Sequence, residues 1–160
     1  MQQTEPMFRI ATHDPRRHLI DWLAAMNCVW YPVELDPELN PSLDPRALLA
    51  AQCKVGTQTV LLQHDLDNRP DHARVICVLG PLPRGGVVPM LLRLLQANLI
   101  IALRGSGAVL GLEAGADAVC LTDELSLAEG AEEAFRVRLH HLASQVERWQ
   151  EGRLFADAGP

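Results

Sequence analysis

The spacing of apolar residues along this chain of 160 residues predicts three helices. The first spans 14–27, because Asp14-Pro15 is an N-cap residue followed by proline at the first helical position. Its apolar residues fall at i, i+3, i+4 and i+7 and therefore share one side of the helix: Leu19, Trp22, Leu23 and Met26. The other two helices are predicted over 89–103 and 126–151.

Short runs of strand-like composition fill the intervals between the helices. Three precede the central helix, over 47–55, 57–64 and 73–79, and two follow it, over 108–112 and 116–122. The connections between the first three are short and Gly56-Thr57 is a candidate tight turn, so we expect these three to form an antiparallel meander. The predicted order is α-β-β-β-α-β-β-α, an α+β fold with helices packed on an antiparallel sheet.

The segment 31–45 is rich in proline, which occurs at positions 32, 37, 41 and 45. Proline lacks a backbone donor and fixes φ, so this density predicts an irregular, exposed connector. The length of the chain suits one domain with a sizeable core, and 1–160 is therefore expected to be a single domain.

The central helix is apolar around nearly its whole circumference. Only Arg93 and Gln96 form a narrow polar stripe. A helix that is apolar on both sides is buried on both sides. One side can pack on the sheet of its own chain, and we expect the other to pack against a partner subunit.

A capping box formed by Ser126 and Glu129 is expected to begin the last helix. Apolar residues then recur at spacings of four and three, as one helical face requires: Phe135, Leu139, Leu142, Val146 and Trp149. Acidic residues in the first turns and Arg148 near the end suit the helix dipole.

The overall charge argues against binding to nucleic acid or to anionic membranes. The chain has 14 Lys and Arg against 20 Asp and Glu, a formal net charge of −6, with no segregated basic stripe. No apolar stretch reaches the roughly 20 residues needed to span a bilayer, and 1–14 lack a signal-peptide pattern. The four cysteines form no C-x-x-C pair and lie among apolar residues, so we expect buried free thiols in a cytoplasmic protein.

Each candidate motif for catalysis or for binding a nucleotide or metal has a better structural explanation. The glycine-rich segment 105–111 lies between a helix and a strand, the reverse of the order in a dinucleotide-binding fingerprint. His140 and His141 are neighbours, which point about 100° apart on a helix and cannot hold one metal ion. The aspartates of the loop 65–71 lack the glycine and downstream acidic ligand of a calcium loop. We therefore expect no catalytic residue, metal or cofactor, and no enzyme activity.

Three sequence elements occur in an order that is typical of one protein family. They are Leu82-Pro83 with Leu91-Leu92-Arg93-Leu94-Leu95-Gln96-Ala97-Asn98-Leu99, then Leu110-Gly111-Leu112-Glu113 with Val119 and Leu121, then the last helix with Trp149. Together they resemble the class I type III secretion chaperones, the Tir-chaperone family, over about 48–149. That family has an LLxANL-like central helix, a GLxxxxxxVxL strand pair and a long last helix. The proline-rich connector and the glycine-dense turn at 105–111 depart from its pattern.

The resemblance implies a small acidic homodimer with the central helix at its interface. The expected interface residues are Leu91, Leu94, Leu95, Asn98 and Leu99. Such a dimer binds the N-terminal segment of a secreted effector, keeps it extended and soluble without ATP, and assists its export from the bacterial cytoplasm. The effector can contact apolar patches on the dimer and add a strand to a sheet edge.

The apolar stripe of the first helix fits either packing in the core or the wall of an effector groove. We expect the groove to include Leu19, Trp22, Leu23 and Met26. The main alternative function is a dimeric α+β adaptor or regulatory module that binds a folded protein partner. An enzyme acting on small molecules is a more distant third.

Overall fold

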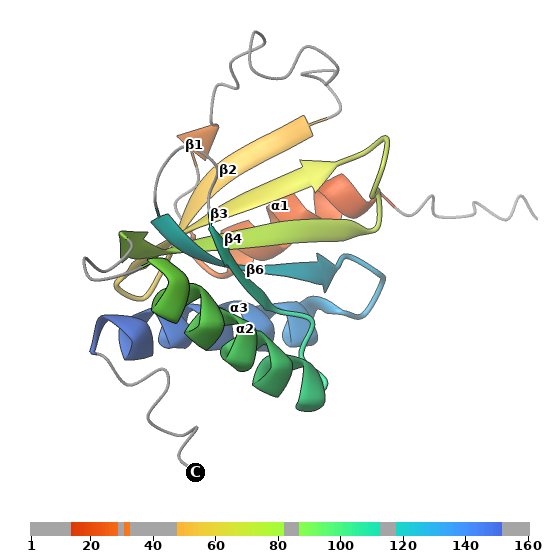
Figure 1. Cartoon of the computed structure of the whole chain (residues 1–160). Helices are drawn as coiled ribbons and strands as arrows, with labels where there is room; N and C mark the ends of the chain where they lie inside the picture. Colours follow the sequence, from red (N-terminus) through yellow and green to blue (C-terminus); the bar gives the residue numbers. More distant parts are fainter. Residues whose placement is uncertain (1–13, 29–30, 33–47, 82–86, 113–117, 152–160) are drawn as a thin grey trace, which may run out of the picture.

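One antiparallel sheet with three helices forms the fold of the computed structural model, which describes residues 14–28, 31–32, 48–81, 87–112 and 118–151. The helices are α1 (Pro15–Ala25), α2 (Val87–Leu103) and α3 (Glu132–Gln150). The strands are β1 (Tyr31–Pro32), β2 (Leu48–Val55), β3 (Gln58–Asp65), β4 (His72–Pro81), β5 (Val109–Leu112) and β6 (Ala118–Ser126). Their order in the sheet is β1-β2-β3-β4-β6-β5, with every neighbouring pair antiparallel. The predicted α+β fold and the order of its main elements are confirmed (Figure 1).

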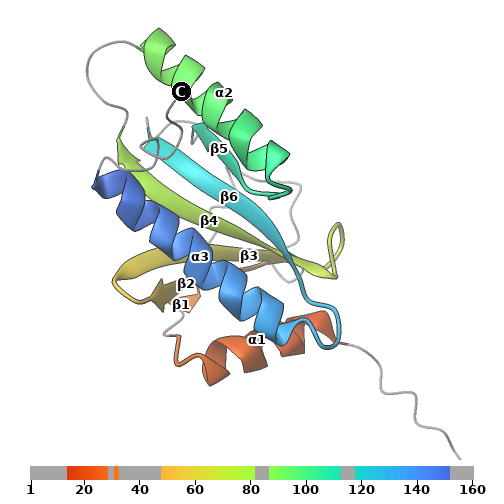
Figure 2. The ribbon, with the colours of Figure 1, turned by 90° about the horizontal axis from the view of Figure 1, so that it is seen from below.

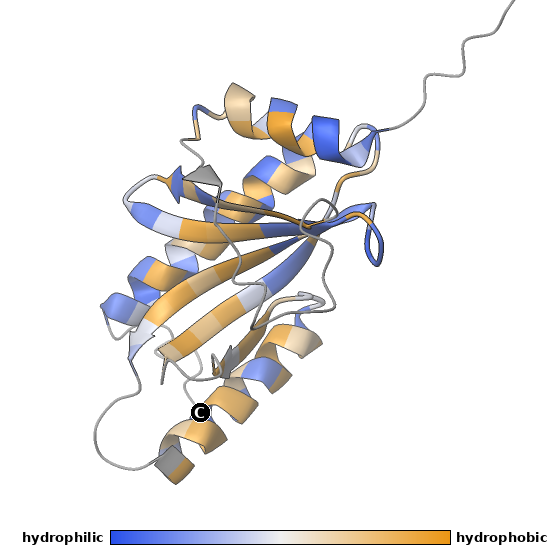
Figure 3. Ribbon diagram, turned by 90° about the horizontal axis from the view of Figure 1, so that it is seen from above, coloured by the Kyte–Doolittle hydropathy of each residue, from blue (hydrophilic) through white to orange (hydrophobic). Residues whose placement is uncertain are grey.

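The helices occupy different places around the sheet. Helix α3 lies across one face and contacts β2, β3, β4 and β6, and α1 lies beside it on the same face (Figure 2). The two helices meet where the ring of Trp22 contacts that of Phe135, with ring centroids 5.4 Å apart. Helix α2 packs along β5 at the edge of the sheet. Among the described residues no helix covers the opposite face of the sheet, which Figure 3 shows from above.

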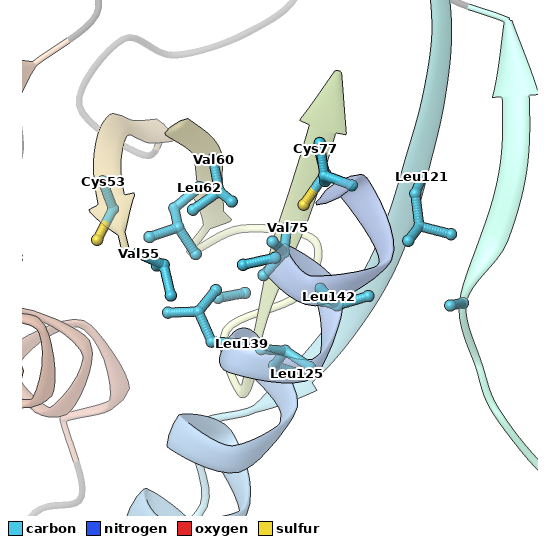
Figure 4. Packing of buried hydrophobic residues seen from close by; sticks show 14 of the residues in the cluster. Cys53, Val55, Val60, Leu62, Val75, Cys77, Leu121, Leu125, Leu139 and Leu142 are labelled. Atoms are coloured by element: carbon cyan, nitrogen blue, oxygen red, sulfur yellow. The ribbon is translucent and has the colours of Figure 1, made fainter. Parts of the chain in front are cut away.

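The core forms between α3 and the inner face of the sheet. Alternate residues of each strand are buried, as the period of two in the sequence predicts. Figure 4 shows Leu139 and Leu142 of α3 among buried side chains of the strands, including Leu62 and Val75. The buried side chains that alternate along the strands and those spaced by four and three along α3 thus form one apolar layer between the sheet and the helix.

Helix α1 begins where the sequence predicts, because Asp14 and Pro15 both fit its first turn. The Asp14 side chain accepts a hydrogen bond from the backbone N–H of Arg17 at 3.2 Å, and Pro15 is the first helical residue. The central helix α2 also forms, beginning at Val87 rather than at residue 89.

The predicted start of the last helix is wrong. Ser126 belongs to β6, where it pairs with His72, and α3 begins only at Glu132 without a side-chain cap. The extended chain continues beyond Ser126, because the N–H of Leu127 donates to the carbonyl of Asp71 and the Leu127 side chain is buried. Gly130 then has a φ of +80°, which an α-helix cannot contain, so a helix cannot extend back to Ser126.

The proline-rich connector is not wholly irregular. Tyr31 and Pro32 form the short edge strand β1, paired with Gln52 and Ala51 of β2. Proline is tolerated there because an edge strand has one side free of ladder hydrogen bonds. The remainder of the connector, 33–45, lies outside the described residues.

Candidate functional site: the outer face of helix α2

Helix α2 has two apolar sides with very different exposure. Leu94 is 4% exposed, and Ala97 is buried with it against the chain's own sheet. The other side points away from the molecule and consists of Val88, Leu91, Leu92, Leu95, Leu99 and Leu103. We call these six residues the α2 outer face. The sequence predicted two apolar sides, and the part of the chain that the structure describes covers only one of them.

The exposed leucines of the α2 outer face form a continuous ridge. Leu95 is 65% exposed and Leu99 is 61% exposed, and both are flanked by leucines one helical turn away. Apolar side chains at spacings of three and four along one helix are the pattern that packs against another helix. A contiguous exposed apolar patch of this kind marks an interaction surface on a water-soluble domain.

Asn98 fixes the orientation of α2 relative to the sheet. Its Nδ2 donates to the Leu110 carbonyl at 2.8 Å, and the Leu110 N–H donates to its Oδ1 at 2.7 Å. The side chain therefore makes the pair of hydrogen bonds that a residue of a further strand would make with β5. This contact fastens α2 to β5 and occupies the backbone groups of the edge strand at that point.

The residues predicted for the dimer interface therefore separate into two groups. Leu91, Leu95 and Leu99 lie on the α2 outer face. Leu94 and Asn98 are turned towards the chain's own sheet, where one is buried and the other bonds to Leu110. The sequence could show that α2 is apolar throughout, but not which leucines its own sheet would cover.

The apolar stripe of α1 is part of the core of the single chain. Leu19, Trp22 and Leu23 are buried, and only Met26 is half-buried at the end of the stripe. The ring of His18 stacks on that of Trp22 from the other side, with centroids 5.8 Å apart. Of the residues expected to form an effector groove, only Met26 is accessible to another protein without movement of α1.

A buried ion pair joins the turn after α2 to β6 and α3. Arg138 Nε donates to Asp123 Oδ2 at 2.6 Å, and the Asp123 side chain is only 4% exposed. Arg138 also donates through Nη2 to Ser106 Oγ. Gly107 fits beside this pair because a Cβ atom there would lie 3.1 Å from Asp123 Oδ1. The glycine-dense turn thus serves packing around a buried carboxylate, a role that its sequence alone did not reveal.

Two further polar side chains, at the end of β3, have defined structural roles. His64 is fully buried on β3, and its Nε2 lies 2.8 Å from the Pro70 carbonyl. Its burial lowers the pKa of the imidazole, so the ring is neutral near pH 7. Asp65 closes the loop between β3 and β4 by accepting hydrogen bonds from Asn68 and from the Asp67 N–H, which lower its pKa. This is the geometry of a solvated hairpin tip.

The cysteines are free thiols in an apolar environment. Cys53, Cys77 and Cys120 are buried and Cys28 is half-buried. Burial raises the pKa of Cys77 to about 12 and also raises that of Cys53, so neither forms a thiolate near neutral pH. Within the described ranges, no three His, Cys, Asp or Glu side chains are placed to hold a metal ion. None of the helices in those ranges has the length and apolar character needed to cross a membrane.

Comparison with known proteins identifies the fold. No family model matches the chain, and no curated protein matches its sequence. Among solved structures, a chain of the HopA1–SchA chaperone–effector complex matches with a TM-score of 0.57 and 14% sequence identity. The match covers 85% of this chain and 92% of that chain. The two therefore share a fold over most of their length.

Proposed function

We propose that this protein is a class I type III secretion chaperone that acts as a homodimer in the bacterial cytoplasm. It binds the N-terminal segment of a secreted effector and keeps that segment extended and soluble for export, without ATP, metal or cofactor. The observation that carries this proposal is the fold shared with a chain of a chaperone–effector complex over 85% of the present chain. The order of sequence elements from the central helix to the last helix supports the same family independently.

The α2 outer face supports the homodimer. A two-fold axis beside Leu95 would set the same leucine ridge of each subunit against the other, which is the self-complementary arrangement of most dimers. Because Asn98 fastens α2 to β5, the ridge is held in a fixed orientation before the subunits meet. The cost of ordering an interface is then small.

The two edges of the sheet differ in how open they are to an added strand. At the β5 edge, the backbone groups of Leu110 already bond to Asn98. At the opposite edge, the described part of β1 pairs with Ala51 and Gln52 alone, although β2 is eight residues long. We therefore propose that an extended effector segment adds to the sheet beside β1 and β2, the edge that also lies nearest to α1.

The open face of the sheet provides apolar contacts for the same segment. Ile76 pairs with Leu61 on one side and with Thr122 on the other, and Thr122 pairs with Val109. This row crosses four strands on the face that no described helix covers, and Val109 is exposed within it. An unfolded segment that lies across such a row is kept from aggregating because its apolar side chains are covered.

The proposed groove on α1 is reduced to its accessible part. We propose that Met26 contacts the effector and that Leu19, Trp22 and Leu23 support it from the core. Trp22→Ala should then lower the free energy of unfolding by about 3–5 kcal/mol, as for other buried tryptophans. Met26→Asp should lower the melting temperature less than Trp22→Ala does, because Met26 is only half-buried, and it should weaken effector binding. Unaltered binding by a folded Met26→Asp variant would exclude α1 from the binding surface.

Co-purification with an effector fragment tests the function itself. The protein would be expressed with the N-terminal fragment of the secreted protein encoded beside its gene, and each would also be expressed alone. We expect the fragment to be soluble only in the complex and to remain sensitive to protease, as an extended segment is. A fragment that is folded and protease-resistant by itself would instead favour an adaptor for a folded partner. The absence of any complex would contradict the chaperone proposal.

A further inference from the structure

A pocket of about 250 Å³ lies between the end of α2, the strands β5 and β6, and the middle of α3. Figure 2 shows β5 and β6 between α2 and α3. Its floor is apolar, formed by the buried side chains of Leu110, Leu121 and Leu142. Small-molecule and cofactor sites usually measure roughly 300–1,000 Å³, so this volume suits a single large side chain better than a cofactor.

The rim of the pocket is cationic, although the protein as a whole carries a net charge of −6. Arg104, Arg138 and Arg148 line it together with His141, and none of the described residues lining it is acidic. Arg138 is compensated from below by Asp123. Burial lowers the pKa of the His141 imidazole most, and the nearby charges of Arg138 and Arg148 lower it further.

Glu147, which precedes Arg148 on α3, bonds away from the pocket. Glu147 accepts a hydrogen bond from Thr57 Oγ1 at 3.0 Å, and Thr57 lies in the turn between β2 and β3 on the far side of the helix. Arg104, at the mouth, therefore faces the pocket with no carboxylate among the described residues that line it. An apolar floor beneath a basic rim complements an apolar side chain flanked by carboxylates.

We propose that this pocket docks a short acidic segment of the effector, with one leucine or aromatic side chain in the pocket and neighbouring aspartates or glutamates on the rim arginines. The proposal rests on the chaperone function proposed above and names the chemistry of one segment of its client. A buried apolar anchor ringed by charge-assisted hydrogen bonds is the arrangement found at binding hot spots. The pocket uses Ile101 from the inner side of α2, so a dimer formed through the α2 outer face leaves it accessible.

Selection from a random peptide library displayed on phage tests the chemistry even while the client is unidentified. The intact protein is the bait, and the Arg104→Glu variant is the counter-selection. We expect the enriched peptides to combine acidic residues with one large apolar residue. The most enriched peptide, labelled with a fluorophore, is then titrated with each protein variant, and its anisotropy is measured.

The variants predict a specific pattern of affinities. Arg104→Glu and Gln145→Glu each place a carboxylate at the rim of the pocket. Each should raise the dissociation constant of the peptide about tenfold or more, since hydrogen bonds to charged groups contribute about 1.5–3 kcal/mol. Arg93→Glu makes the same charge change on the same helix outside the pocket and should alter binding less than about twofold. Replacing the acidic residues of the peptide by lysine should abolish its binding.

The results also separate this proposal from the general function. Enrichment of basic or neutral peptides, or equal binding by Arg104→Glu and the unmodified protein, would overturn the pocket assignment. A peptide that binds in the pocket but does not compete with the effector fragment would show that the pocket serves another partner. If the effector fragment binds and no acidic peptide does, the pocket proposal fails and the chaperone function stands.

Discussion

Replacement of Leu95 by aspartate should dissociate the dimer without unfolding the subunit. Leu95 lies at the middle of the α2 outer face and is 65% exposed in the single chain. The folded subunit therefore hardly depends on this side chain. A dimer formed through α2 would cover it on both subunits, so the same substitution acts on assembly twice.

The magnitude follows from the exposed area of Leu95. Covering roughly two thirds of a leucine side chain contributes about 1–2 kcal/mol for each subunit. The aspartate forgoes this contribution and must also be dehydrated in an apolar interface, which adds at least about 1 kcal/mol more. With both subunits affected, the dimer loses about 4 kcal/mol or more, which raises its dissociation constant about a thousandfold.

Sedimentation equilibrium and light scattering measure the oligomeric state of each variant, and thermal melting reports its fold. We expect a dimer for the unmodified protein and a cooperatively folded monomer for Leu95→Asp. Val137→Asp is the matched control, because Val137 is 55% exposed on α3, away from the α2 outer face, and this variant should remain a dimer. Leu94→Asp, at a buried position of the same helix, should instead fail to fold.

Two results would refute the reasoning about α2. One is an unmodified protein that is monomeric at the concentrations used for sedimentation equilibrium and light scattering. The other is a Leu95→Asp variant that stays dimeric, which would place the interface elsewhere. If Leu95→Asp does not fold at all, Leu95→Ser distinguishes a subunit that is stable only as a dimer, because its melting temperature should then rise with protein concentration.

Three further predictions concern stability. Burial lowers the pKa of His64 from 6.5, so the unfolded chain binds more protons at this residue than the folded chain does. The free energy of unfolding should therefore decrease below pH 6.5, by at most about 1.4 kcal/mol per pH unit. Urea unfolding across this range should show a smaller loss for His64→Gln. Asp123→Asn should lower the free energy of unfolding by about 1–3 kcal/mol in the same assay, which is less than for a fully buried pair because the Arg138 side chain is 26% exposed. Adding Arg138→Met to this variant should lower it little further. Asn98→Ala removes two hydrogen bonds to Leu110 and should cost about 1–3 kcal/mol, whereas equal stability would show that water replaces them fully.

Local patterns were sufficient to predict most of the fold. The strands β2, β3 and β4 lie close to their predicted positions because each buries alternate residues on one face, and that alternation is visible in the sequence. Helix α1 was located by the pair Asp14-Pro15, which acts within a single turn. Patterns of this kind depend only on residues that are close in the sequence, so they can be recognised without the structure.

Local patterns failed where a distant contact decides the outcome. The sequence from Ser126 to Glu129 satisfies a capping box, but pairing of Ser126 with His72 and burial of Leu127 keep the chain extended. The two residues of β1 form a strand because β2 lies beside them, against the propensity of Pro32. Competition between local propensity and tertiary contacts is settled by the contacts.

The candidate site shows the same division. The apolar circumference of α2 predicted that the helix would be covered on two sides. The rotation of the helix about its axis, which decides that Leu94 is buried and Leu95 exposed, is set by packing on β5. The deep positions of Asp123 and His64 could not be predicted either, because their partners, Arg138 and Pro70, are identified only by the folded chain.

Asn98 connects the β5 edge of the sheet to the α2 outer face. By bonding to both backbone groups of Leu110, its side chain closes the β5 edge to strand addition at that point. The same bonds hold the α2 outer face at one angle to the sheet, so two subunits that meet through α2 would also hold their sheets in a fixed relation. An effector segment that contacted both subunits of the proposed dimer would need that fixed relation, because its binding surfaces would have to stay at a constant separation. Loss of Asn98 should therefore weaken assembly and effector binding by more than its modest effect on the stability of the subunit would suggest.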